Sequence, residues 1–295
     1  MTSTERGIIA MIAANACFIA NDALMKLAMQ LVPVGESIFI RGLATGLLFW
    51  AIFTVSAQKF ELAPLLNQKI ALRSLAEIIA SVGYLIALAN MPIGDLAGLL
   101  QLVPLLLMAG AALFLGETIG WRRWTAAAVG LLGAVLIVRP SGNTISAAHA
   151  VAAICIAGIV ARDLLTRGLS AKISSLSISA TSAAGLTLAG LGLGLTESWH
   201  TPSLPALAYS VAASAFLIGA NTWLVVAMRA GDIGTVGPFR YTALIWALLA
   251  GYFIWGEIPT LWSWLGMALL VFAGVYSLRR SAKVRASQIP EPATK

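Results

Sequence analysis

Residues 94–115 read GDLAGLLQLVPLLLMAGAALFL, a run that is apolar almost throughout. About 20 such residues let a helix cross the hydrocarbon core of a bilayer. The rest of the 295-residue chain is similar, because 59% of its residues are apolar, 11% are charged and its mean hydropathy is +0.90. A soluble domain carries about 25% charged residues, and a disordered chain is poor in apolar ones. The composition excludes both classes and predicts a membrane protein.

Ten helical spans are predicted from such runs and from the turn residues between them. Each run is continuous, whereas a transmembrane β-strand alternates in polarity over about ten residues. The expected fold is therefore an all-α membrane protein. The expected spans are 7–29, 34–56, 69–89, 94–115, 121–138, 147–168, 174–196, 204–229, 233–255 and 260–279.

The basic residues of the loops orient these spans. Ten spans place both termini on one side of the membrane, and most of the 19 Lys and Arg residues fall on that side. Cytoplasmic loops carry the excess of Lys and Arg. Both termini are therefore expected in the cytoplasm.

The two halves of the chain repeat one another. A shift of 140 residues lays Gly116-Glu117 on Gly256-Glu257 without a gap. Each half holds five spans, an odd number, so the second copy enters the membrane from the opposite side. Residues 1–143 and 144–280 are expected to be two inverted five-helix repeats, and 281–295 a basic cytoplasmic tail.

An inverted repeat is typical of alternating-access transporters, whose substrate site lies near the midplane between the halves. The other interpretation is a duplication that serves packing alone, as in an oligomeric structural protein. A channel would need a continuous polar stripe along several helices, and the sequence has one central polar cluster instead.

Matching motifs in the two halves carry a family resemblance. They are Met91-Pro92-Ile93-Gly94, Pro104 and Leu115-Gly116-Glu117, then Gly231-Asp232-Ile233-Gly234, Gly256-Glu257-Ile258-Pro259 and Gly266 to Gly274. They resemble the EamA-type repeat of the drug/metabolite transporter (DMT) superfamily. The resemblance implies a ten-helix carrier in the bacterial inner membrane. Many such carriers export amino acids, and others take up riboflavin, S-adenosylmethionine or related molecules. Leu244 departs from the pattern, because many members have a second proline there, although Pro238 lies nearby.

The resemblance places the third, fourth, eighth and ninth spans on the cavity wall, and two of them carry a charge. A charge at span centre costs about 2.5–3.5 kcal/mol on insertion scales, so it needs a partner or a wet cavity. One interpretation is a zwitterion site, with Arg240 facing a substrate carboxylate and Glu77 facing an amine or carrying a coupling proton. The structural alternative is an ion pair of Glu77 with Arg240 or with Arg73.

Charges nearer the span ends predict gates. Asp22 and Lys26 are four residues apart and share a helix face near the outer end of the first span. Asp163 and Arg167 are their repeat counterparts near the inner end of the sixth. Such a pair either closes one end of the transport pathway while the other end opens, or only neutralises its own two charges near a helix end. The residues assigned to gating are Asp22, Lys26, Arg41, Arg162 and Asp163, with Glu36 beside Arg41.

Aromatic and amide side chains lie between these charges. Tyr and Trp usually sit at the membrane interface. A ring near mid-span, such as Trp246, indicates either a pocket for an aromatic or apolar substrate or packing against lipid or a helix. With Glu77 and Arg240, the residues assigned to substrate binding are Tyr84, Gln101, Asn221, Trp223, Tyr241 and Trp246.

The residues that other functions would require are missing from the sequence. The chain has no G-x-x-x-x-G-K-[ST] run for a nucleotide, no Cys/His spacing for a metal and no clustered nucleophile or acid–base set for an enzyme. Its basic residues orient the protein and are not arranged for nucleic acid. No cofactor is expected. The expected partners are a small-molecule substrate, a coupling proton and the lipid bilayer. The fifth and tenth spans, free of internal charge, face lipid or a second protomer in a homodimer.

The sequence therefore predicts a secondary transporter that works by alternating access. The leading substrate is an amino acid or a related amphipathic compound, with export favoured over uptake. The alternative is an uptake carrier for a larger aromatic-ring metabolite, such as riboflavin or S-adenosylmethionine.

Reporters fused after Lys295 test the predicted orientation. Green fluorescent protein fluoresces when it folds in the cytoplasm, whereas alkaline phosphatase is active only outside it. We expect a fluorescent first fusion and an inactive second one, because the loop charges hold the carboxy terminus inside. The opposite pattern of the two reporters would overturn the assigned orientation.

Overall fold

The computed structural model describes residues 3–55, 68–116, 120–138, 146–167, 175–230 and 236–286. Within these ranges all regular structure is helical, which confirms the all-α expectation. The helices are α1 (Ser3–Ala28), α2 (Val34–Val55), α3 (Gln68–Asn90), α4 (Ile93–Leu100), α5 (Val103–Leu115), α6 (Trp121–Val138), α7 (Ala147–Arg167), α8 (Ser175–Leu193), α9 (Leu204–Ala230), the 3₁₀ segment η2 (Gly237–Tyr241), α11 (Thr242–Ala250), the π-helical segment η3 (Gly251–Trp255) and α12 (Leu261–Ala286).

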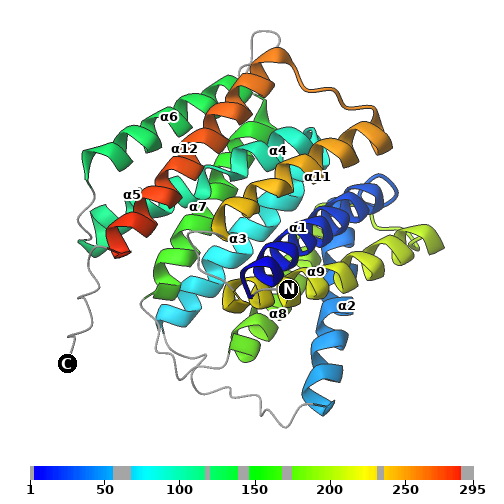
Figure 1. Ribbon diagram of the computed structural model, residues 1–295. Coiled ribbons are helices and arrows are strands. Elements are labelled where there is room, and N and C mark those ends of the chain that lie inside the picture. Colours follow the sequence, from blue (N-terminus) through cyan, green and yellow to red (C-terminus); the bar gives the residue numbers. More distant parts are fainter. Residues whose placement is uncertain are drawn as a thin grey trace.

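These elements match the ten expected spans (Figure 1). The fourth span consists of α4 and α5, and the ninth of η2, α11 and η3. By length and composition, five helices of the described ranges are each able to cross a membrane. They are Ser3–Ala28, Gln68–Asn90, Ile93–Phe114, Ala147–Thr166 and Leu204–Ala230.

The helices pack in pairs that follow the order of the sequence repeat. α1 packs along α9, and α3 packs along α7. In span order α7 is the counterpart of α1, and α9 that of α3, so each of these pairs corresponds to the other. α6 packs on its own counterpart α12, and α2 on its counterpart α8 (Figure 1). Two related five-helix halves packed against each other would produce this pairing.

The fourth and ninth spans are both interrupted, at repeat-related positions. Gln101 lies between α4 and α5, and Pro104 stands in the first turn of α5. Tyr241, 140 residues after Gln101, ends η2, which contains Pro238. Proline disrupts a regular helix because it has no N–H group and its ring clashes with the preceding turn. Pro104 and Pro238 stand at these interruptions, and Leu244 lies within the uninterrupted α11.

The repeated Gly-Glu motif has a backbone role. Gly116 and Gly256 have φ angles of 69° and 67°, and each ends its span as a left-handed C-cap. Glycine adopts this conformation without the steric cost that a Cβ brings. The two halves therefore end their interrupted spans in the same way.

Asn15 of α1 supports the break in the ninth span. Its Nδ2 lies 3.0 Å from the carbonyl oxygen of Phe239 and 3.2 Å from that of Arg240. The same atom lies 2.9 Å from Oγ1 of Thr242. A helix break in a membrane leaves carbonyl groups that only the protein can satisfy. The first span therefore adds hydrogen bonds to the one that the Thr242 hydroxyl donates to the Phe239 carbonyl within the ninth span.

Glycine brings α6 and α12 close together. A Cβ on Gly133 would lie 2.7 Å from the carbonyl oxygen of Gly266, so only small residues allow this approach. The other sides of the two helices expose large apolar residues, such as Leu132 and Phe272. These sides are suited to contact with lipid or a second protomer.

Replacing Asn15 by Ala is expected to destabilise the protein by about 1–3 kcal/mol, because the part-buried hydrogen bonds from α1 to the break in the ninth span are lost. Thermal unfolding of the purified protein in detergent measures this. Asn221→Ala is the control, because the Asn221 amide lies at an exposed position and donates to the Leu217 carbonyl of its own helix. The control should stay within about 0.5 kcal/mol of wild type. Equal losses in the two variants would contradict the role of Asn15.

Candidate functional site

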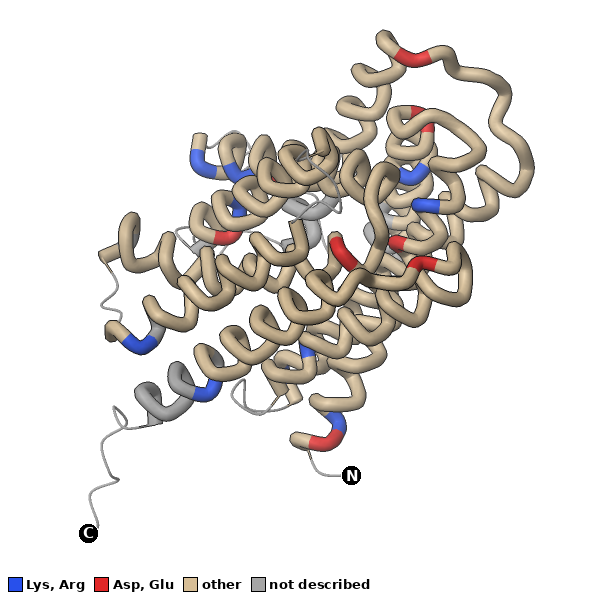
Figure 2. Tube along the Cα trace, turned by 90° about the horizontal axis from the view of Figure 1, so that it is seen from above, with Lys and Arg blue, Asp and Glu red and all other residues tan. Residues whose placement is uncertain are grey.

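The charged side chains within the helices form three groups. Figure 2 shows that most of the trace is uncharged and that the Lys, Arg, Asp and Glu positions gather in a few places. We call the end of the bundle where α1 ends and α4 begins the outer end, following the orientation expected from the loop charges. The three groups lie at the outer end, about one turn deeper, and toward the inner end.

The outer group is built around an ion pair between Lys26 and Glu257. Nζ of Lys26 lies 2.6 Å from Oε1 of Glu257 and 2.9 Å from the carbonyl oxygen of Met91. Oε2 of Glu257 accepts a hydrogen bond of 3.0 Å from the backbone N–H of Ile93. Nζ also lies 4.8 Å from the centroid of the Trp255 ring, within cation–π range. This outer ion pair joins the end of α1 to the start of α4 and to the residues after η3.

The middle group corrects the expected pairing of Asp22 with Lys26. Asp22 accepts hydrogen bonds from Tyr84 Oη at 2.5 Å and from Asn21 Nδ2 at 2.8 Å. It forms no ion pair within the described ranges, although Arg41 is close enough for its charge to act on it. Lys26 is held by Glu257 and a carbonyl group instead, which leaves Asp22 to contact α3.

Arg41 also differs from expectation. Its side chain is buried, and its Nε has no hydrogen-bond partner among the described residues. Glu36, the neighbour expected to join it, likewise has a buried Oε2 without a partner there. The charge of Arg41 is compensated by the nearby Asp22, not by a hydrogen-bonded Glu36.

The inner group joins α3 to α7. Oε2 of Glu77 lies 3.0 Å from Arg73, and Oε1 lies 3.1 Å from Arg162. Arg162 also contacts Asp163 at 2.8 Å. The bond to Arg73 is the structural alternative stated for Glu77, and the bond to Arg162 connects two spans that lie far apart in the sequence. The side chain of Arg167 lies outside the described residues.

Glu77 and Arg240 lie in different surroundings. The Arg240 side chain is exposed on η2, and it forms no ion pair among the residues that the structure describes. Glu77 is instead engaged by two arginines of α3 and α7. The two side chains are therefore not paired with each other here, and their role as a zwitterion site stays a prediction.

The remaining predicted binding residues are dispersed. Gln101 and Tyr241 are buried at the two helix breaks. Asn221 and Trp223 lie on an exposed face of α9, and Trp246 on an exposed face of α11. The structure therefore brings Tyr84 and Asp22 together but does not gather the rings into one pocket.

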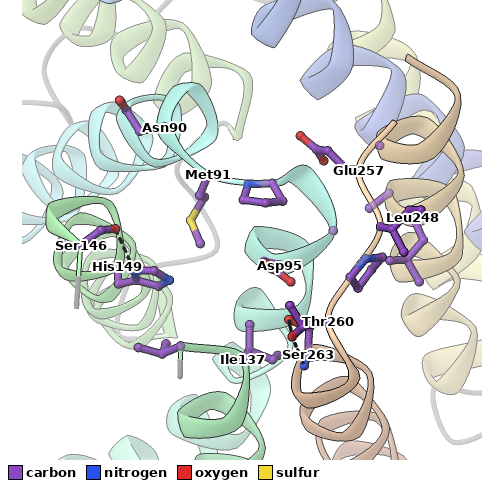
Figure 3. A pocket seen from close by; sticks show the side chains of 17 residues that line it. Asn90, Met91, Asp95, Ile137, Ser146, His149, Leu248, Glu257, Thr260 and Ser263 are labelled. Atoms are coloured by element: carbon purple, nitrogen blue, oxygen red, sulfur yellow. Dashed lines mark hydrogen bonds between the residues drawn. The ribbon is translucent and has the colours of Figure 1, made fainter. Parts of the chain in front are cut away.

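A cavity of about 320 Å³ lies beside the outer ion pair (Figure 3). This volume is at the lower end of the range of about 300–1,000 Å³ that small-molecule sites occupy. Its apolar wall includes Met91, Leu248 and Ile137. Its polar residues are Asn90, Asp95, Ser146, His149, Glu257, Thr260 and Ser263.

The sequence analysis did not assign these polar residues to a site. Glu257 was identified only as part of a repeated motif. Asp95 follows the Ile93-Gly94 motif directly, and His149 begins the second half. Only the fold brings these three regions together, so no spacing in the sequence signals the cavity.

Comparison with known proteins identifies the family. Residues 5–139 match the EamA-like transporter family. A riboflavin transporter of Rhizobium johnstonii is 30% identical over 209 residues, which are 70% of this chain and 69% of that protein. The chain belongs to the EamA-like transporter family. It is thus a member of the DMT superfamily and a multi-pass membrane protein, and its family indicates a small-molecule transporter rather than an enzyme.

Other family relatives differ in their named cargo. A riboflavin transporter of Vibrio cholerae is 26% identical over 183 residues, 62% of this chain and 61% of that protein. A pseudopaline exporter of Pseudomonas aeruginosa is 27% identical over 152 residues, 51% of this chain and 52% of that protein. One crystal structure, 18% identical, has a TM-score of 0.65 and covers 96% of this chain and 99% of its own. That likeness supports the fold alone.

A double-mutant cycle tests the contact of Glu77 with Arg162. Glu77→Gln leaves two arginines without their shared carboxylate, and Arg162→Gln removes one of them. We expect the double variant to be less destabilised than the sum of the two single variants, by about 0.5–3 kcal/mol. SDS-induced unfolding in mixed micelles measures the free energies. Glu77→Gln combined with the exposed, distant Arg279→Gln should be additive. Additivity of the Glu77 and Arg162 changes would show that the two side chains do not interact.

Proposed function

We propose that this EamA-like protein is a secondary carrier that moves a small amphipathic metabolite across the bacterial inner membrane by alternating access. The observation that carries the proposal is the outer ion pair. Lys26 comes from the first half of the chain and Glu257 from the second, and their contacts reach the outer ends of both interrupted spans. When two halves rock against each other, the opening between them needs a contact of this kind. The contact closes the opening when it forms and opens it when the two side chains separate.

The inner group supports the same mechanism at the other end of the molecule. Glu77 belongs to the first half and Arg162 to the second. If the halves rock as inverted repeats do, opening the outer mouth separates Lys26 from Glu257, and opening the inner mouth separates Glu77 from Arg162. We therefore assign gating to these two pairs between halves, in place of pairs within one helix.

The cargo that fits the cavity best is an amino acid or a related amphipathic compound. Carboxylates and apolar side chains both line the cavity, and its volume suits a small metabolite. Export is the favoured direction, and the relative named as an exporter is consistent with it.

Riboflavin is the second candidate. Two of the relatives are named riboflavin transporters, and one of them is 30% identical to this chain. A larger aromatic-ring metabolite would contact the apolar wall of the cavity. Radiolabelled riboflavin and amino acids are therefore the first compounds to compare.

For a coupling proton, Asp22 is a better binding residue than Glu77. Glu77 is already held in ion pairs by two arginines. Asp22 is buried and accepts hydrogen bonds from the neutral groups of Tyr84 and Asn21, with Arg41 as the nearby charge.

Proteoliposomes containing the purified protein test the proposed function. Labelled amino acids and riboflavin are followed in both directions, with protein-free liposomes as the baseline. We expect saturable movement of at least one compound, and the preferred direction distinguishes export from uptake. Failure of every compound in both directions would remove the cargo assignment.

Variants of the outer ion pair test the mechanism. Lys26→Gln and Glu257→Gln should each slow transport at least tenfold, because the outer mouth no longer closes securely. The double exchange Lys26→Glu with Glu257→Lys should transport better than either single charge reversal, because the attraction is restored. Arg279→Gln, an exposed change of the same kind, should transport as wild type does. Wild-type rates in both neutral variants would refute the gate.

A further inference from the structure

One of the two carboxylates that line the outer cavity has no cationic partner among the described residues. The two carboxylates are Asp95 and Glu257. Glu257 is fully engaged, because Lys26 and the backbone N–H of Ile93 bind its two oxygens. Asp95 remains, and it forms no ion pair in the part of the chain that the structure describes.

The groups around Asp95 leave it partly unsatisfied. Its Oδ1 is buried and accepts no hydrogen bond from the described residues. The Ser263 hydroxyl is its polar neighbour, and Glu257, Lys26 and His149 lie near it. His149 is turned to Ser146, whose Oγ lies 2.8 Å from its Nδ1. A carboxylate withdrawn from water without a donor is costly, so the site gains from a cation.

The repeat gives no structural reason for this acid. The residue 140 positions after Asp95 is Thr235, whereas Glu117 and Glu257 are both retained at their positions. A carboxylate required for the backbone geometry of the repeat would be expected in both halves. Asp95 is therefore specific to the first half, where it lies in the first turn of α4 and lines the cavity.

We propose that Asp95 binds an ammonium group of the cargo in the outer cavity. The inference rests on the proposed carrier function and narrows its substrate class. Figure 3 shows Asp95 in the middle of the cavity, with His149 on one side and Ser263 on the other. The ammonium group lies against the Asp95 carboxylate beside Ser263, and the apolar part of the cargo packs against Met91 and Leu248. The cargo is thus an amphipathic amine, of which an amino acid is one form.

Matched ligands test the amine requirement on the purified full chain in detergent. L-phenylalanine and L-phenylalaninamide carry the ammonium group, whereas N-acetyl-L-phenylalanine lacks it. The corresponding leucine series covers a smaller side chain. We expect at least one ammonium compound of either series to raise the thermal unfolding midpoint, and its N-acetyl analogue to leave it unchanged.

Variants test the residue. Asp95→Asn should weaken binding of the ammonium compound about tenfold or more, which is the effect of losing one hydrogen bond to a charged group. Asp95→Glu keeps the charge and should retain part of the affinity, even if Asp95→Asn folds poorly. Glu5→Gln, the same change of a carboxylate far away in the first turn of α1, should bind as wild type does.

Three results would overturn the inference. They are equal binding by wild type and Asp95→Asn, equal binding of ammonium and N-acetyl compounds, and no stabilisation by any ammonium compound. If any of these three results is found and Asp95→Asn still transports riboflavin at the wild-type rate, the amine site is refuted and the carrier function stands. If the wild-type protein transports none of the tested compounds, the carrier proposal is refuted instead.

Discussion

A polar group inside a membrane must find its partner within the protein, and this constraint organises the structure. Water is not available to a charge or a free carbonyl at that depth. The carbonyl groups at the break in the ninth span accept hydrogen bonds from Asn15 of the first span, and the Phe239 carbonyl also accepts one from Thr242. Lys26 is tolerated near the outer end of α1 because a carboxylate, a carbonyl group and an indole ring surround it. The contacts of Asn15 and Lys26 tie together segments that are distant in the sequence.

Helix α3 is where these contacts converge. Glu77 and Tyr84 are seven residues apart, about two helical turns, and so lie on nearly the same face. Glu77 contacts Arg162 of α7 in the second half, and Tyr84 contacts Asp22 of α1 in the first. A shift of α3 along its axis would disturb both contacts together. This helix therefore links the inner group to the middle group.

The sequence predicts the spans well because a run of apolar residues is a local property. The interruptions at Pro104 and Pro238 are equally local, since proline acts on its own helix. The partners of the charges are not local. The i,i+4 spacing of Asp22 and Lys26 matched a pair within one helix, but the fold offers Lys26 the carboxylate of Glu257 instead. The same spacing of Arg73 and Glu77 did predict a contact, and only the packing of α3 on α7 adds Arg162. Trp246 lies near mid-span, and only the fold shows that its face is exposed.

The two ion pairs between the halves also determine how the protein responds to the electric field of the membrane. Moving one elementary charge through 100 mV takes about 2.3 kcal/mol. Lys26 with Glu257, and Glu77 with Arg162, each bring together one positive and one negative charge. As long as the two charges of a pair move only a few ångströms apart, little net charge crosses the field. Under the proposed alternating-access mechanism, the exchange between closed and open states would then be nearly independent of voltage, and the membrane potential would act mainly on the charge of the cargo itself.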